Sequence, residues 1–172
     1  MHMLKRWFVA TMLILCLSLV AVGCAKQGGT GKSATGGPMF MDKASTADVA
    51  QFMADAKGKV VLLNVFASWC GYCMQEVPDL VALRGIYPAG ELAMLGVSLD
   101  DAADLPELQR IIKEMNISYP VYMVGDDYAE KNNITGIPVT IIYDRNGMEY
   151  KTILGYVERS EIEKPIVELL NR

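Results

Sequence analysis

Two cysteines separated by two residues, Cys70 and Cys73, are the side chains of this sequence best suited to chemistry. They lie in the stretch Trp-Cys-Gly-Tyr-Cys at residues 69–73. Two intervening residues on the first turn of a helix bring the sulfur atoms close enough to form a disulfide. Such a dithiol can exchange with other disulfides: the thiolate of Cys70 would attack, and Cys73 would resolve the mixed disulfide.

The segments on either side of this motif predict where the cysteines lie. Residues 60–66 are β-branched or apolar except for one asparagine, which predicts a strand buried in a sheet with helices on both faces. From residue 74 onward the apolar residues recur at helical spacing: Val77, Leu80, Val81, Leu83 and Ile86. Cys70 is therefore expected at a helix N-terminus, where unpaired N–H groups and the helix dipole favour an anion. We expect the pKa of its thiol to lie below the ordinary value of about 8.5.

Other uses of a Cys-X-X-Cys motif have weaker support. A closed zinc site needs four ligands, but the only histidine is His2, and no second cysteine pair follows the N-terminal segment. A c-type haem site needs histidine directly after Cys73, where Met74 stands. We therefore expect no metal and no cofactor besides the disulfide of Cys70 and Cys73. A purely structural disulfide remains an alternative.

Length and charge limit the classes of function. The 172 residues correspond to one ordinary domain, and the formal net charge is −4. Without residues 1–23, which include Lys5 and Arg6, 14 basic residues face 20 acidic ones, a net charge of −6. An acidic chain without a basic cluster is a poor candidate for binding nucleic acid. We expect a monomer that acts on other proteins.

The N-terminal segment has the pattern of an export signal. Lys5 and Arg6 precede an apolar run over residues 7–22, so residues 1–23 are expected to be a signal peptide. The sequence Ala-Val-Gly-Cys at residues 21–24 resembles the bacterial lipoprotein signal, in which the cysteine is lipidated, although that motif usually has leucine at the place of Ala21. This resemblance implies a lipid on Cys24. An uncleaved membrane anchor is the alternative, and both place the domain outside the cytoplasm.

Residues 24–38 are expected to form the lipidated cysteine and a tether. Residues 26–38 are rich in glycine and lack apolar periodicity. A flexible linker of this length has a root-mean-square reach of roughly 20 Å. The globular domain, residues 39–172, should therefore stay near the membrane and rotate freely.

The sequence pattern of the globular part predicts strands that alternate with helices. Besides the helix after Cys73, helices are expected over residues 45–56 with Ser45 as N-cap, 105–115 and 126–132. Further strands are expected over residues 92–99, 117–124 with Pro120 interrupting, 139–143 and 149–155, the last two joined by an Asn-Gly turn. Ser160 and Glu163 match a capping box for a last helix, whose start Pro165 should bend or delay. This order predicts an α/β fold, a three-layer sandwich with a mixed central sheet.

Two stretches carry a resemblance to a known family. Residues 64–78 contain Trp-Cys-X-X-Cys, a glutamate three residues after the second cysteine and a proline two residues further on. Residues 136–147 contain Gly-Ile-Pro followed by an apolar strand and a turn. Over about residues 40–170 the chain resembles the TlpA/ResA type of membrane-anchored thiol-disulfide oxidoreductases. The resemblance implies a thioredoxin-like fold.

The same resemblance implies a surface that binds client proteins. Pro138 would be a cis-proline that lies against the disulfide, and an X-Pro bond is the only kind with an appreciable cis population. Trp69 would shield Cys70 while leaving its sulfur within reach, unless it is simply a core tryptophan. The residues implied for this surface are Trp69, Gly71, Tyr72, Ile137 and Pro138.

Glu76 is implied as the group that takes the proton of Cys73. In thioredoxin itself a buried aspartate six residues before the first cysteine has this task, but here that place holds Asn64, which does not titrate. Glu76, one helical turn after Cys73, could receive the proton if burial raises the pKa of its carboxyl towards neutrality. A solvated glutamate without a role is the alternative.

The expected function is reduction of disulfides in client proteins, with electrons from a thiol-disulfide donor in the membrane. Apocytochrome c is a candidate client because the family often serves cytochrome maturation. Many relatives have proline where Tyr72 stands, and Gly-Tyr between the cysteines is the dipeptide of the bacterial disulfide isomerase DsbC, so an isomerase or oxidase stays open. A tethered peptide-binding module with a static disulfide is a further alternative. Peroxidase chemistry is disfavoured because Leu63 and Ala67 stand where peroxiredoxins have proline and a polar residue.

Overall fold

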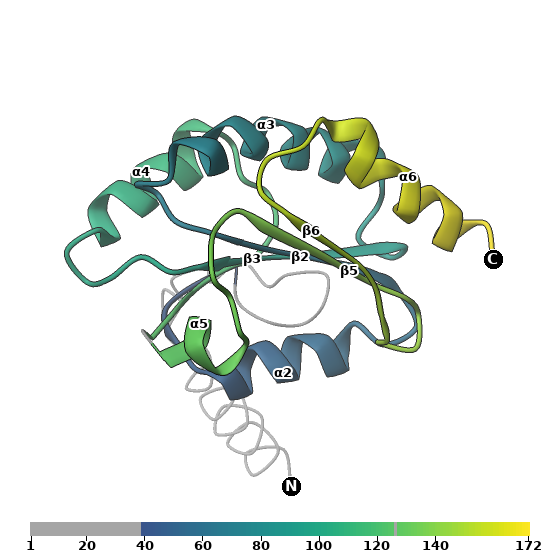
Figure 1. Ribbon diagram of the computed structural model, residues 1–172, viewed down its shortest axis with the longest axis horizontal. Helices are drawn as coiled ribbons and strands as arrows, with labels where there is room; N and C mark the ends of the chain where they lie inside the picture. Colours follow the sequence, from purple (N-terminus) through teal and green to yellow (C-terminus); the bar gives the residue numbers. More distant parts are fainter. Residues whose placement is uncertain (1–38, 126) are drawn as a thin grey trace, which may run out of the picture.

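The computed structural model describes residues 39–125 and 127–172, which form a six-stranded mixed sheet between two layers of helices (Figure 1). The strands are β1 (Phe40–Ala44), β2 (Val60–Phe66), β3 (Leu92–Ser98), β4 (Val121–Val124), β5 (Val139–Tyr143) and β6 (Glu149–Leu154). The helices are α2 (Thr46–Asp55), α3 (Gly71–Ile86), α4 (Leu105–Glu114), α5 (Asp127–Lys131) and α6 (Arg159–Leu170). The predicted three-layer α/β fold is confirmed. The expected signal peptide, Cys24 and the tether lie outside the described residues.

The order of the strands brings distant parts of the sequence to one edge of the sheet. The order is β1-β4-β3-β2-β5-β6, in which the first four strands are parallel and β5 and β6 are antiparallel to their neighbours. Parallel strands end at the same edge, so the segments that follow β2, β3 and β4 meet there. The antiparallel strand β5 begins at this edge, with Val139 opposite Val65. The Cys-X-X-Cys motif, the segment after β3 and Pro138 therefore converge.

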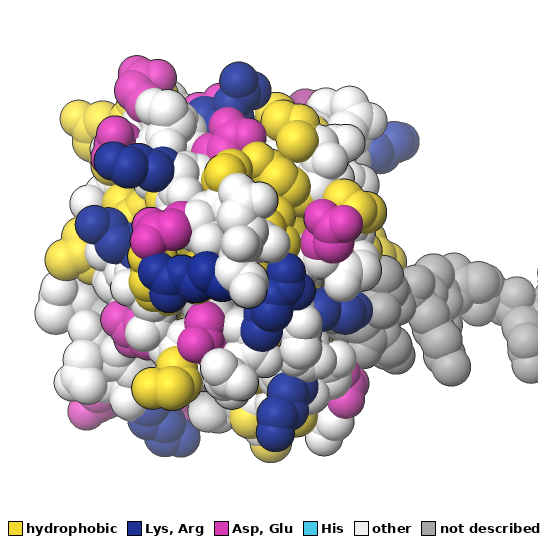
Figure 2. All heavy atoms as spheres, turned by 90° about the vertical axis from the view of Figure 1, so that its right-hand side faces the viewer, with side chains coloured by type: hydrophobic (Ala, Val, Ile, Leu, Met, Phe, Trp, Pro, Cys, Tyr) yellow, Lys and Arg dark blue, Asp and Glu magenta, His cyan; other side chains and the backbone are white. Residues whose placement is uncertain are grey.

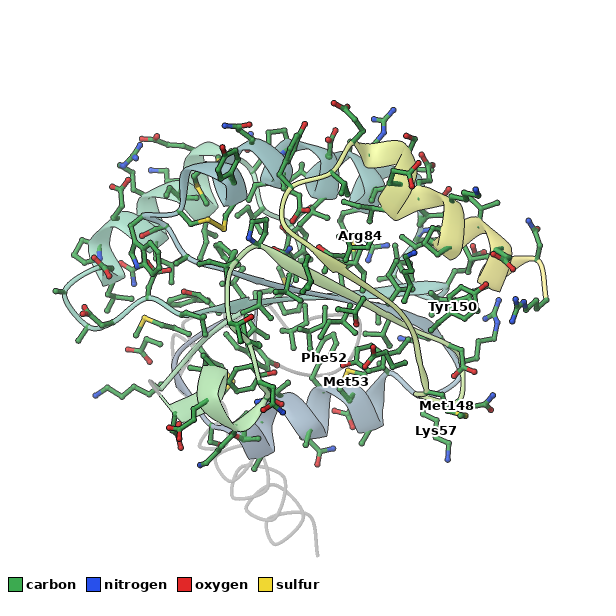
Figure 3. All side chains as sticks on the ribbon, viewed as in Figure 1. Phe52, Met53, Lys57, Arg84, Met148 and Tyr150 are labelled. Atoms are coloured by element: carbon green, nitrogen blue, oxygen red, sulfur yellow. A yellow bond between two sulfur atoms is a disulfide. The ribbon has the colours of Figure 1, made fainter. Side chains whose placement is uncertain are left out.

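The two helical layers bury opposite faces of the sheet. In Figure 1, α3, α4 and α6 cover one face and α2 and α5 cover the other. Every residue of β2 and β3 is buried, as their continuous apolar runs predict for central strands covered on both faces. Phe52 and Met53, labelled in Figure 3, rise from α2 towards the sheet. Packing on both faces therefore fixes the position of the central strands. It also fixes the start of α3, which follows β2 after a short loop.

The first described helix begins as its sequence predicts. Ser45 is the N-cap of α2, and its hydroxyl accepts a hydrogen bond from the backbone N–H of Asp48. The carboxylate of Asp48 accepts one in return from the N–H of Ser45 at 2.7 Å. This reciprocal capping box satisfies N–H groups that a helix start otherwise leaves unpaired.

The predicted start of the last helix is wrong. Helix α6 begins at Arg159, ahead of Ser160, and its N-cap is Glu158, whose side chain makes no capping hydrogen bond. Pro165 neither delays this start nor ends the helix, because it lies inside α6 with its ring buried. A proline inside a helix gives up one backbone hydrogen bond. Apolar burial along the inner face of α6 offsets that loss: Ile162, Pro165, Ile166 and Leu169.

Two strands differ from the prediction. Strand β1 was not expected, because Phe-Met-Asp-Lys-Ala has no clear alternation; it is an edge strand that pairs only with β4, with a register shift between Met41 and Ala44. Strand β4 begins directly after Pro120 and is not interrupted by it. The carbonyl of Pro120 accepts a hydrogen bond from Gly96 at 2.8 Å, so the proline joins the sheet through its oxygen alone.

The surface at one end of the molecule mixes charges of both signs. On the face in Figure 2, which is the right-hand side of Figure 1, basic and acidic side chains are interspersed. A nucleic-acid surface instead gathers Lys and Arg on one face.

Within the described part of the chain, no helix is both long enough and apolar enough to cross a bilayer.

Candidate active site

Cys70 and Cys73 form a disulfide at the start of α3, with an S–S distance of 2.12 Å and a Cα–Cα distance of 5.2 Å. Cys70 is the N-cap of the helix, and its Sγ accepts a hydrogen bond from the backbone N–H of Cys73 at 3.2 Å. The prediction that Cys70 lies at a helix N-terminus is confirmed. In the reduced protein this N–H and the helix dipole would stabilise a thiolate on Cys70.

The two sulfurs differ in how far they can be reached. Cys70 is 9% exposed and Cys73 only 1%. Trp69 and Tyr72 flank them and are largely exposed, so Trp69 is not a core residue. An incoming disulfide can therefore approach Cys70 but not Cys73. This asymmetry fits the expected division into an attacking and a resolving cysteine.

The segment before β5 lies against the disulfide. The Ile137–Pro138 peptide bond is cis, as predicted for Pro138. The carbonyl oxygen of Ile137 is 3.9 Å from Cys70 Sγ. Pro138 is buried, and its carbonyl accepts a hydrogen bond from Gly155 at 2.8 Å. The structure thus brings Ile137 and Pro138 next to Cys70, while their role in binding a client stays a prediction.

Glu76 is buried behind the disulfide, only 1% exposed, and not solvated. It follows Cys73 by three residues on α3, so the two side chains share one face of the helix. Asn64 donates to Glu76 Oε2 at 2.7 Å and to Thr140 Oγ1 at 2.9 Å, and the hydroxyl of Thr140 lies 3.3 Å from the same Oε2. Among the described residues, Glu76 Oε1 has no hydrogen-bond partner.

Burial dominates the acidity of this carboxyl. Loss of solvation raises the pKa of Glu76 from 4.5 to about 7, although the hydrogen bonds from Asn64 and Thr140 pull it down. The negative charge of Asp79 adds a smaller upward push. A carboxyl with a pKa near neutrality can both accept and release a proton at physiological pH. Asn64 does not titrate itself, but it donates a hydrogen bond to Glu76, the residue that does.

A second buried carboxylate near the disulfide was missed from the sequence. Asp100, 2% exposed, follows β3 and accepts hydrogen bonds from the backbone N–H and the hydroxyl of Ser68, two residues before Cys70. Its other hydroxyl partner is Ser98. Strand pairing could have indicated this contact. Asp100 follows β3, which is parallel to β2, so it lies beside the loop that leads from β2 to Cys70.

Fold and site together define a thioredoxin-like thiol-disulfide oxidoreductase. A disulfide at a helix N-terminus, a cis-proline against it and a buried carboxyl one turn further on are arranged for disulfide exchange. Among residues 39–125 and 127–172, no three His, Cys, Asp or Glu side chains are grouped so that they could hold a metal ion.

Comparison with known proteins agrees with this class. The model of the AhpC/TSA family matches residues 38–148, and the chain belongs to that family. It is 27% identical over 170 residues to the thioredoxin-like protein YneN of Bacillus subtilis, covering 95% of this chain and 98% of that protein. It is 26% identical over 115 residues to the thiol-disulfide oxidoreductase ResA of Geobacillus kaustophilus, covering 65% of this chain and 64% of ResA.

A solved structure shows the same fold. The thiol:disulfide interchange protein of the thioredoxin family from Chlorobium tepidum superposes with a TM-score of 0.61 at 28% sequence identity. The match covers 68% of this chain and 83% of that one.

Proposed function

We propose that this protein reduces disulfides in client proteins outside the cytoplasm, using the Cys70–Cys73 dithiol. The observation that carries the proposal is the pairing of a reachable sulfur at a helix N-terminus with a buried carboxyl, Glu76, one turn past the resolving cysteine. A static disulfide would need neither the greater accessibility of Cys70 compared with Cys73 nor a costly buried carboxyl on the same helix face as Cys73. The name of the relative ResA, a thiol-disulfide oxidoreductase, supports thiol-disulfide exchange, and the direction of that exchange is part of the proposal.

The reaction proceeds in two exchanges. The thiolate of Cys70 attacks one sulfur of a client disulfide, which forms a Cys70–client disulfide and releases the first client thiolate. Glu76 then accepts the proton of the Cys73 thiol, and the resulting thiolate attacks Cys70 Sγ. This step forms the Cys70–Cys73 disulfide and expels the second client sulfur, which takes up a proton. Two electrons pass from the dithiol to the client, and an external dithiol donor must restore them.

Client capture by a resolving-cysteine variant tests the proposal. In the Cys73→Ala protein, Cys70 can attack but the mixed disulfide cannot be resolved, so we expect client proteins to accumulate on Cys70. The adducts should disappear on treatment with a reductant and should be absent from the Cys70→Ala/Cys73→Ala control. If the double variant keeps full function in cells and Cys73→Ala captures nothing, the protein is a peptide-binding module with a static disulfide. Apocytochrome c is the client we propose to look for first.

The reduction potential separates a reductase from an isomerase or oxidase. The exposed Tyr72 before Cys73 leaves both directions of exchange open. We expect an equilibrium potential of about −270 mV or lower, near that of thioredoxin. A value of about −120 to −180 mV, the range of DsbA and protein disulfide isomerase, would favour oxidation or isomerisation of clients.

The proposed location depends on the N-terminal sequence. Residues 1–23 would direct export, and a lipid on Cys24 would keep the domain at the membrane, close to a thiol-disulfide electron donor. Incorporation of a labelled fatty acid that is lost in Cys24→Ala would support this anchor. Equal labelling of the two proteins, or none in either, would leave an uncleaved N-terminal segment as the anchor.

Peroxidase chemistry, another use of a cysteine on related folds, has less support. The position three residues before Cys70 is Ala67, which is buried and carries no polar group. Leu63, seven residues before Cys70, is buried in β2. Neither could help to bind and polarise a peroxide.

A further inference from the structure

The loop between β2 and α3 is held from one side by the end of β3. Asp100 accepts hydrogen bonds from the backbone N–H of Ser68 on both of its oxygens at 3.0 Å, and Oδ1 also accepts one from the Ser68 hydroxyl. Oδ2 accepts a further one from the hydroxyl of Ser98. In addition, the N–H of Leu99 donates to the carbonyl of Phe66 at 2.8 Å. The segment after β3 therefore binds both the end of β2 and the loop that follows it.

These hydrogen bonds are buried and bear directly on Cys70. Asp100, Ser68 and Ser98 are 2%, 8% and 0% exposed, so each polar group relies on the others in place of water. Ser68 is two residues before Cys70, and the N–H of Cys70 closes a turn onto the carbonyl of Ala67 at 3.1 Å. The position of the Ser68 backbone thus fixes the turn that delivers Cys70 to the start of α3.

We propose that Asp100 is a positioning residue for disulfide exchange: through the backbone of Ser68 it holds the Cys70 sulfur where the N-terminus of α3 can stabilise its thiolate. The proposal rests on the function proposed above, since it concerns how readily Cys70 becomes the attacking thiolate. Asp100 acts through Ser68 and makes no contact with the sulfur among the hydrogen bonds of the described residues.

Loss of the charge of Asp100 and loss of its hold on the loop would shift the pKa of the Cys70 thiol in opposite directions. The proposed role can therefore be tested. If Asp100 acted only as a nearby negative charge, removing that charge would lower the pKa of the Cys70 thiol and speed its alkylation. If it positions the loop, a loosened Ser68 lets the sulfur leave the N–H groups of α3, so the pKa of the thiol rises and alkylation slows.

The experiment measures the alkylation rate of Cys70 against pH in the reduced full-length protein. The variants are Asp100→Asn, Ser68→Ala and Ser98→Ala, with melting temperatures in parallel. Asp101→Asn is the matched control, because it removes the same charge from the adjacent, exposed residue, whose carboxylate accepts from Ala103 and not from Ser68. We expect roughly three- to tenfold slower alkylation at pH 6.5 in Asp100→Asn. Ser68→Ala and Ser98→Ala should slow it less, and Asp101→Asn should leave it unchanged or slightly faster.

Three results would overturn the proposal while leaving the proposed function in place, and a fourth would defeat both. Faster alkylation in Asp100→Asn, with no change in the two serine variants, would show a charge effect. Lower melting temperatures with unchanged alkylation would show that the cluster only stabilises the fold. If Asp100→Asn does not fold, unchanged alkylation in both serine variants would count against the proposal in the same way. A wild-type protein that neither exchanges disulfides nor alkylates below the ordinary pH of a thiol would defeat the proposed function itself, and this inference with it.

Discussion

Two carboxyl groups, Glu76 and Asp100, are buried near the same disulfide but are held in different ways. Asp100 has hydrogen-bond donors on both oxygens, and one of these donors is a backbone N–H. Glu76 has donors on Oε2 only, both from neutral side chains, while Oε1 has no partner in the described part of the chain. Both oxygens of Asp100 therefore have hydrogen-bond partners, whereas one oxygen of Glu76 has none among the described residues.

The difference shows how one fold can assign separate tasks to similar groups. Burial penalises a charged carboxylate, and hydrogen bonds to its oxygens offset that penalty. Around Glu76 the offset is incomplete, so its pKa rises to about 7 and the group can carry a proton. Asp100 instead accepts hydrogen bonds on both oxygens, from Ser68 in the loop before Cys70 and from Ser98 at the end of β3. In the proposals above, proton transfer and loop geometry are thus assigned to different residues, which can be altered one at a time.

The largest effect that we predict is a pH dependence of stability due to Glu76. Its pKa is about 7 in the folded protein against 4.5 as the ordinary value. Between these values the folded state keeps a proton that the unfolded state has lost, so raising the pH favours unfolding. At about 1.4 kcal/mol per pKa unit, the contribution is fully present below pH 4.5 and about 3 kcal/mol has been lost once the pH passes 7.

Urea unfolding of the oxidised protein between pH 4.5 and 8 measures this loss. The difference in free energy of unfolding between wild type and Glu76→Gln should change by about 3 kcal/mol over that range, because glutamine does not titrate. Glu130→Gln, on the exposed surface of α5, serves as the control and should follow the wild type. A Glu76→Gln curve parallel to that of the wild type would mean that folding does not raise the pKa of Glu76.

The second predicted effect concerns the rate of exchange. In Glu76→Gln the proton of Cys73 has no nearby acceptor, so the resolving step should slow by roughly ten- to a hundredfold. Stopped-flow reduction of a model disulfide by the reduced protein would show this, together with loss of an inflection near pH 7. Asp100→Asn should keep that inflection, because it acts on Cys70 and not on Cys73. Rates for Glu76→Gln equal to the wild type at every pH would remove Glu76 from the mechanism.

Those parts of the fold and site that depend on local pattern could be predicted from the sequence. The apolar run of β2 and the helical spacing after Met74 placed Cys70 at a helix start. The resemblance to the TlpA/ResA type added the cis bond before Pro138 and pointed to Glu76, with burial as the condition for its role. Each of these follows from a few adjacent residues or from a motif of known spacing.

The parts that were missed depend on contacts between distant segments. Asp100 appears in the sequence as one of two adjacent aspartates, and only the pairing of β2 with β3 shows which of them meets Ser68. Strand β1 has no pattern of its own and is defined by its pairing with β4. The start of α6 was misplaced because Ser160 and Glu163 satisfy a local rule, whereas the helix begins at Arg159 and packs Pro165 into the core.

The smallest effect that we predict tests whether the donors on Glu76 Oε2 set its acidity. Thr140→Val keeps the buried shape of the side chain but removes the hydroxyl 3.3 Å from Oε2, so the pKa of Glu76 should rise further. The inflection in the exchange rate should move up by about half a pH unit, because the shorter bond from Asn64 remains. Thr140→Ser retains a hydroxyl and should keep the wild-type inflection. If the inflection of Thr140→Val stays in place or moves down, the hydroxyl of Thr140 does not lower the pKa of Glu76. The contrast with Asp100 would then rest on burial and on the hydrogen bond from Asn64 alone.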